Sequence, residues 1–161
     1  MQIIENADKI AIIIKTVSFS AITYYCNFKL TNRKISINIR TIIMIIVIGI
    51  ICGIIKNEVN YLASTLILII LLSILFSRND FAGGALTTII SISINYGIEL
   101  VAIFISFGTN KIFNINNDYI RVTVIIVLHI FIIYRIFKIK KFKYGIAYFK
   151  NYKNKEHMNL L

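Results

Sequence analysis

Five apolar stretches, separated by short polar segments, follow one another along the chain. An α-helix rises about 1.5 Å per residue, so about 20 mostly apolar residues cross the roughly 30 Å of hydrocarbon in a bilayer. The stretches reach about this length because charged side chains at their ends can extend to the membrane surface. We therefore predict five membrane-spanning helices, at residues 10–28, 40–56, 59–77, 82–107 and 119–137.

Ile and Val are abundant in these stretches, and both residues also favour β-strands. In hydrocarbon, however, an open sheet edge leaves backbone groups unpaired at a cost of several kcal/mol each, and none of the stretches alternates as a barrel strand does. The predicted fold class is all-α, a multi-pass transmembrane helical bundle over residues 1–134. Its connections, at residues 29–39, 56–58, 78–80 and 109–119, are short, so we expect antiparallel neighbours.

The first stretch is the least apolar of the five, because it contains Lys15 and several hydroxyl side chains. The alternative for it is a buried or interfacial helix. A cleaved signal peptide does not fit, because Glu5 and Asp8 dilute the positive charge ahead of the stretch and no A-x-A site follows it.

Composition and charge then indicate that the chain lies in a membrane and how it is oriented there. The hydrophobic fraction of 58% excludes an ordinary soluble domain, and the net charge is +11. Of the 18 Lys and Arg residues, thirteen lie in the first connection or directly after it at Arg40, in the third connection and in residues 135–161, whereas four (Lys9, Lys56, Lys111 and Arg121) lie on the other side. The positive-inside rule therefore predicts a cell-membrane protein with its N-terminus outside and its C-terminus in the cytoplasm.

The fourth stretch carries a stripe of small and polar residues. They recur at intervals of three and four, so they share one face of a helix: Gly84, Thr88, Ser91, Asn95, Glu99, Ala102 and Ser106. We expect this face to contact protein or water rather than lipid. For Gly84, Thr88 and Ser91 the interpretation is helix packing, with hydroxyls bonded within the bundle.

Glu99 needs a further explanation, because an ionised carboxylate at membrane depth is costly unless it is paired, protonated or hydrated. Counted from the outer ends of their helices, Glu99, Lys15 and His129 all lie roughly 9–14 Å below the surface. We predict that Glu99 pairs with Lys15 or, as a second choice, with His129. A ligand pocket open to the outside would include Lys15, Asn95, Glu99 and His129; the alternatives are a purely structural ion pair and a packed, neutral histidine.

Gly49 and Gly53 have the GxxxG spacing, which allows two helix backbones to approach closely. The approach can occur within the chain, as helix packing, or between two copies, as a homodimer. Cys26 and Cys52 lie in apolar runs, so we expect inert thiols. No motif for catalysis, for nucleotide binding or for a metal site occurs in the sequence, and no cofactor is predicted.

Residues 135–161 form a tail in which lysines alternate with Phe and Tyr. Such a tail directly after a span fits the anionic inner leaflet of the bilayer better than nucleic acid, because lysines bind lipid headgroups and aromatic rings lie at headgroup depth. The residues expected at the membrane surface are Lys138, Lys140, Lys141, Lys143 and Lys150. The chain ends in the apolar MNLL, which can be the start of a sixth span.

The arrangement resembles the N-terminal membrane half of clostridial-type sensor histidine kinases of the GHKL group, similar to the accessory-gene-regulator peptide receptors. The resemblance rests on the Ile-, Asn- and Lys-rich composition and on three segments, ASTLILIILLSILFS, ALTTIISISINYGIELVAIFIS and RIFKIKKFKYGIAYFKNYKNKEHMNLL. It implies the input half of a quorum-sensing two-component system. In that family, further spans, dimerisation helices and an ATP-binding kinase domain follow the basic exit.

This chain contains neither a phosphoacceptor helix nor a nucleotide-binding motif, so it corresponds to a truncated kinase, a fragment or a stand-alone paralogue, and we predict no enzyme activity. The leading hypothesis is a receptor or sensor module for an extracellular signal such as a peptide. The alternatives are a small transporter or transport accessory subunit that uses Glu99, and a structural membrane partner of a larger complex.

Overall fold

The computed structural model describes residues 2–31, 38–76, 81–113 and 118–139, and every regular element in these ranges is a helix. The helices are α1 (Gln2–Leu30), α2 (Ile39–Glu58), α3 (Tyr61–Phe76), α4 (Phe81–Phe113) and α5 (Asp118–Lys138). The predicted all-α class is therefore confirmed.

Within the described ranges, four helices are long and apolar enough to cross a membrane: α1 over Lys9–Leu30, α2 over Ile39–Glu58, α4 over Phe81–Gly108 and α5 over Ile120–Lys138. The chain thus has the character of a multi-pass membrane protein. The remaining helix, α3, has 16 residues and is about 24 Å long, so a full crossing by residues 59–77 stays a prediction. Residue 77 lies outside the described ranges.

Two connections are shorter than predicted. The helix α4 continues to Phe113 and α5 begins at Asp118, so residues 109–113, 118 and 119 are helical rather than part of a connection. The helix α1 likewise continues through Lys29 to Leu30. The reason is that polar residues end an apolar stretch without ending a helix, and the chain contains no Pro that would break it.

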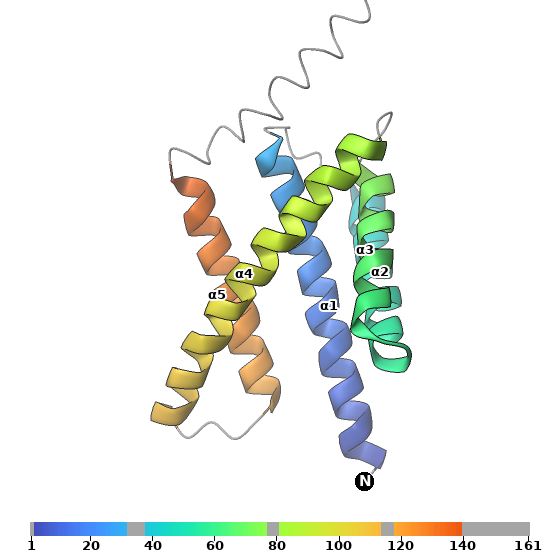
Figure 1. Ribbon diagram of the computed structural model, residues 1–161. Helices are drawn as coiled ribbons and strands as arrows, with labels where there is room; N and C mark the ends of the chain where they lie inside the picture. The colour runs from blue at the N-terminus through green and yellow to red at the C-terminus, as the bar shows by residue number, and fades with distance from the viewer. Residues whose placement is uncertain (1, 32–37, 77–80, 114–117, 140–161) are drawn as a thin grey trace, which may run out of the picture.

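Successive helices run in opposite directions, and α1 lies between α2 and α3 on one side and α5 on the other, while α4 crosses α1 diagonally from the end of α3 toward α5 (Figure 1). The helix α1 packs against all four other helices. The helices α2 and α3 are joined by a tight turn at Val59 and Asn60. The Val59 N–H donates to the Ile55 carbonyl at 2.9 Å, and the Asn60 Oδ1 accepts the Ala63 N–H at 2.7 Å, which caps the start of α3.

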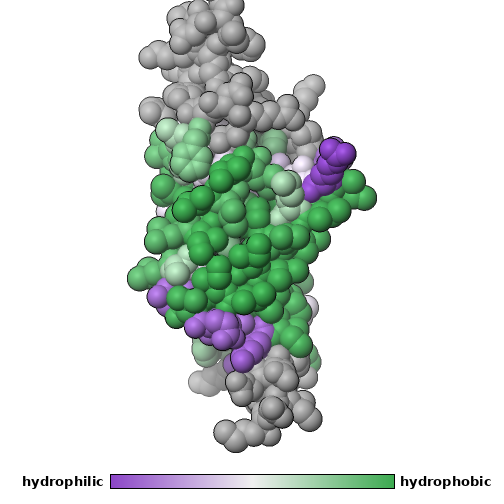
Figure 2. All heavy atoms as spheres, turned by 90° about the vertical axis from the view of Figure 1, so that its right-hand side faces the viewer, coloured by the Kyte–Doolittle hydropathy of each residue, from purple (hydrophilic) through white to green (hydrophobic). Residues whose placement is uncertain are grey.

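The face formed by α2 and α3 is a broad apolar band with hydrophilic side chains along its lower edge and at one upper corner (Figure 2). Its exposed side chains include Ile43, Met44 and Val47 of α2 and Leu62, Leu66, Ile70 and Ile74 of α3. A band of this kind is what a lipid-facing surface requires.

Gly49 and Gly53 of α2 lie directly against α1. A Cβ added at Gly49 would be 2.5 Å from the Val17 Cα, and one added at Gly53 would be 3.0 Å from the Ile13 Cα. The close backbone approach expected from the GxxxG spacing is confirmed, and it occurs within the chain. Because α1 occupies this face of α2, a homodimer could not use it without displacing α1.

The contact at Gly49 reverses the usual effect of alanine in a helix. Gly→Ala normally stabilises a helix by about 1 kcal/mol, but at Gly49 the added methyl group would force α1 and α2 apart. We expect Gly49→Ala to lower the melting temperature in detergent, whereas Gly97→Ala, where no atom lies within 4 Å of the added Cβ, leaves it equal or higher. Equal melting temperatures for the two variants would contradict the close packing.

Candidate functional site

The polar stripe of α4 faces the interior of the bundle. All seven of its residues, from Gly84 to Ser106, are buried, as the spacing predicts. The Thr88 hydroxyl donates to the Gly84 carbonyl at 2.8 Å and accepts a hydrogen bond from the Asn27 Nδ2 at 3.1 Å. Packing with hydroxyls bonded inside the bundle is therefore confirmed for Thr88.

Glu99 of α4 forms an ion pair with Lys15 of α1, with 2.6 Å between the Glu99 Oε1 and the Lys15 Nζ. The predicted pairing with Lys15 is confirmed. The side chain of Glu99 is 11% exposed and that of Lys15 is 32% exposed, so the pair lies at the edge of the interior rather than within it. His129, the second choice as a partner for Glu99, is bonded to Asn95 instead.

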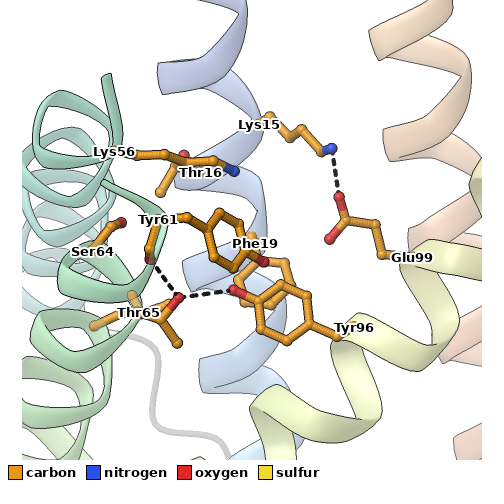
Figure 3. Close-up of a pocket in the computed structure, with 10 residues that line it drawn as sticks. Lys15, Thr16, Phe19, Lys56, Tyr61, Ser64, Thr65, Tyr96 and Glu99 are labelled. Carbon is orange, nitrogen blue, oxygen red and sulfur yellow. Dashed lines mark hydrogen bonds and ion pairs between the residues drawn. The ribbon is translucent and has the colours of Figure 1, made fainter. Parts of the chain in front are cut away.

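The ion pair borders a small pocket between α1, α3, α4 and the end of α2 (Figure 3). The pocket has a volume of about 30 Å³, enough for about two water molecules. Its described lining consists of Lys15, Thr16, Phe19, Lys56, Tyr61, Ser64, Thr65, Leu68, Tyr96 and Glu99. Lys56 and Tyr61 flank the turn between α2 and α3, so the pocket lies at the level of that turn.

Aromatic rings form one wall of the pocket. The ring centroids of Phe19 and Tyr96 are 4.7 Å apart, and those of Tyr61 and Tyr96 are 5.8 Å apart. The Tyr96 hydroxyl lies 3.3 Å from the Thr65 Oγ1, which donates to the Tyr61 carbonyl at 3.0 Å. The Lys56 Nζ lies 4.6 Å from the centre of the Tyr61 ring, a cation–π distance. The pocket therefore combines charged groups with an apolar, aromatic surface.

Sequence reasoning missed most of this lining. Lys56 comes from the last turn of α2, and Tyr61 and Thr65 come from the start of α3. Nothing in the sequence showed that these helix ends would lie beside Glu99. The position of Tyr96, one turn of helix before Glu99, was the available signal for one of the rings.

Asn95 and His129, also predicted to line the pocket, form a separate buried junction that joins three helices. The Asn95 Nδ2 donates to the Thr23 Oγ1 at 2.8 Å and to the Phe19 carbonyl at 3.3 Å, both on α1. The Asn95 Oδ1 lies 2.8 Å from the His129 Nε2 of α5. Because the amide nitrogen donates to α1, its oxygen is an acceptor, so the His129 Nε2 carries the proton.

Polar contacts continue beyond this junction toward the other end of α1. Several hydroxyls, including those of Thr16 and Thr23, donate to the carbonyl four residues earlier. The Ser91 hydroxyl of α4 forms no such hydrogen bond to a described residue. The Ser91 Oγ and the Asn27 Oδ1 are both buried without a hydrogen-bond partner among the described residues. Because Asn27 bonds Thr88, one turn from Ser91 on the same face, these two atoms lie on facing sides of the α1–α4 interface.

The remaining candidate residues divide between the core and the α5 end. Cys26 and Cys52 are free and buried among apolar side chains, as expected. Lys138 is exposed, with its Nζ 4.7 Å from the centre of the Tyr134 ring. Lys140, Lys141, Lys143 and Lys150 lie outside the described residues. In the described part of the chain, no group of three or more His, Cys, Asp or Glu side chains could hold a metal ion.

No protein-family model, no curated protein and no solved structure matches this chain.

The Lys15–Glu99 pair can be tested with a double-mutant cycle. Lys15→Met or Glu99→Gln alone leaves one charge without its partner. Each should lower the free energy of unfolding by roughly 1–3 kcal/mol, less than for a fully buried pair because the Lys15 side chain is partly exposed. The double variant should cost clearly less than the sum of the two single changes. Additive costs in detergent unfolding would show that the two groups are not coupled.

The Asn95 junction leads to a second expectation. Asn95→Leu keeps the number and branching of the side-chain heavy atoms but leaves the His129 N–H without its acceptor and removes the donor to the Thr23 oxygen, so it should destabilise the protein by about 1–3 kcal/mol. Ser93→Ala on the same helix is a matched control, because Ser93 is exposed and its hydroxyl donates to the Ile89 carbonyl of its own helix. If both variants melt at the wild-type temperature, the junction contributes no stability.

Proposed function

We propose that this chain is a membrane-embedded receptor module that binds an extracellular signal at the pocket beside Lys15 and Glu99. The observation that carries the proposal is the 2.6 Å ion pair, which ties α1 to α4 at the edge of that pocket. A group that enters the pocket and binds Lys15 or Glu99 competes with this ion pair. The ion pair then has two states, intact and broken, and a ligand can shift the equilibrium between them.

The size of the pocket constrains how a signal binds. A volume of about 30 Å³ admits one small functional group, not a peptide. A larger ligand therefore inserts one group and rests on the surface near the α2–α3 turn, or binds only after α4 moves away from α1. In both cases binding energy acts on the contact between α1 and α4.

The same two helices carry the proposed response away from the pocket. One turn from Glu99, Asn95 joins α4 to α1 and to His129 of α5. A shift of α4 would therefore reach α5, which leads into the basic residues 135–161. The pocket lies at the end of the bundle that the positive-inside rule predicts to be outside, and α5 ends at the predicted cytoplasmic side. This arrangement agrees with the proposed role as the input half of a histidine kinase.

A pocket thiol tests the proposal. Thr65→Cys, in a background with Cys26→Ser and Cys52→Ser, places one thiol in the pocket of the full chain in membrane vesicles. A small, membrane-impermeant methanethiosulfonate should modify it from the outer side only. The peptide-sized fraction of spent medium from the source organism should slow this modification, and Lys15→Met should abolish the protection.

Val59→Cys in the same background is the control, because Val59 is exposed in the α2–α3 turn and does not line the pocket. Its modification should not change with the medium fraction. Modification of Thr65→Cys from the inner side only would overturn the predicted orientation, and equal protection at both positions would overturn a specific pocket.

A second candidate function, transport, is favoured by the polar contacts that continue from the pocket to Asn27 and Ser91. In a transporter, Glu99 would alternate between a protonated state and the ion pair with Lys15. Proton-coupled uptake into proteoliposomes that Glu99→Gln abolishes would favour this function over the receptor. If neither uptake nor ligand protection occurs, the remaining proposal is a structural partner of a larger membrane complex.

A further inference from the structure

The charges in the pocket do not balance. Its described lining contains two cations, Lys15 and Lys56, and one carboxylate, Glu99. Glu99 is paired with Lys15, whereas the Lys56 Nζ lies over the face of the Tyr61 ring. Glu58, a second carboxylate at this end of the bundle, lies 3.9 Å from Lys9. The pocket therefore offers a positive charge that no second carboxylate of its described lining neutralises.

The position of the two lysines suggests what the pocket binds. Figure 3 shows both side chains reaching into the same pocket, with the rings of Phe19, Tyr61 and Tyr96 beside them. An ammonium group next to aromatic and apolar surface is poorly hydrated, so it gains more from a charged partner than it would in bulk water. A volume of about 30 Å³ suits one compact anionic group, and the rings suit an apolar chain attached to it.

We infer that the pocket recognises a carboxylate joined to an apolar chain, with Lys56 and Lys15 as its charged contacts. The inference rests on the proposed receptor function and names the chemical class of its ligand. Glu99 is then an internal competitor, since its carboxylate occupies Lys15 while the pocket is empty. An incoming carboxylate that takes Lys15 releases Glu99, and with it the ion pair between α1 and α4.

This competition predicts opposite effects for the charged residues. Lys56→Gln and Lys15→Met remove a contact and should weaken carboxylate binding. Glu99→Gln removes the competitor and leaves Lys15 available, so it should strengthen binding. A pocket that preferred cations would show the reverse pattern, because Glu99 would then be the contact and the lysines would be the repelling groups.

The test uses four probes that share a butyl or butyryl chain and differ in charge: butyrate, butyl phosphate, butanol and butylammonium. Each is titrated at constant ionic strength against the full-length Thr65→Cys reporter in vesicles, and the rate of thiol modification is measured. Butyrate should protect at the lowest concentration. Glu99→Gln should lower its half-maximal concentration by at least about fivefold, and Lys56→Gln should raise it by a similar factor.

Lys56→Arg is the matched control, because it keeps the positive charge at the same position, and it should retain the preference for butyrate. Equal protection by butyrate, butanol and butylammonium would overturn the inference. Stronger protection by butyl phosphate would overturn the carboxylate in favour of a phosphate, as in a lipid headgroup.

The two proposals fail separately. If the spent-medium fraction protects the thiol but butyrate shows no advantage, the receptor stands and the carboxylate assignment is wrong. If butyrate protects in a manner that depends on Lys56, yet no component of the medium does, the anion site stands and the receptor proposal is wrong.

Discussion

The antiparallel register between α1 and α4 is the constraint on which the rest of the structure depends. Polar side chains inside hydrocarbon need partners from the same chain, because lipid offers none. Lys15 meets Glu99, Thr23 meets Asn95, and Asn27 meets Thr88, so residues later in α1 meet residues earlier in α4. A shift of one helix by a single turn would break all three contacts together. The register is thus fixed by polar pairs, whereas apolar contacts would tolerate several registers.

The opposite side of α1 is fixed in a different way. There, α2 approaches so closely at Gly49 and Gly53 that no side chain fits between the backbones, and the Ser20 hydroxyl reaches the Ile45 carbonyl at 3.2 Å. One face of α1 therefore packs through hydrogen bonds and an ion pair between side chains, and another packs through close steric fit together with the Ser20 hydrogen bond. Since both faces belong to one rigid helix, the α2–α3 turn is held at the level of Lys15. This placement brings Lys56 and Tyr61 to the same pocket as Glu99.

The helices, the buried stripe of α4 and the Lys15–Glu99 pair could be predicted from the sequence, because each depends on periodicity or on depth along a helix. The sequence did not predict that α3 contributes to the pocket lining or that Asn95 and His129 lie apart from the pocket. Those features depend on how helices rotate and cross, which is decided by contacts such as the one at Gly49. The first stretch illustrates the difference. Its hydroxyl side chains made it the weakest candidate for a membrane span. The same hydroxyls belong to the helix whose candidate span is the most buried of the four, with 39% of its residues buried, compared with 17% for α5.

The place of the ion pair bears on whether it serves stability alone. A pair of opposite charges in a protein interior rarely stabilises more than an apolar pair of similar volume would, because both charges lose their hydration. The α1–α4 contact is already fixed by Asn95 and by Asn27, so Lys15 and Glu99 are not needed to define it. The pair lies instead where Lys15 is partly exposed and where Lys56 adds a further charge beside three aromatic rings. A charged contact at the edge of a pocket can be exchanged for a ligand, and this is the property that a neutral junction such as that of Asn95 lacks.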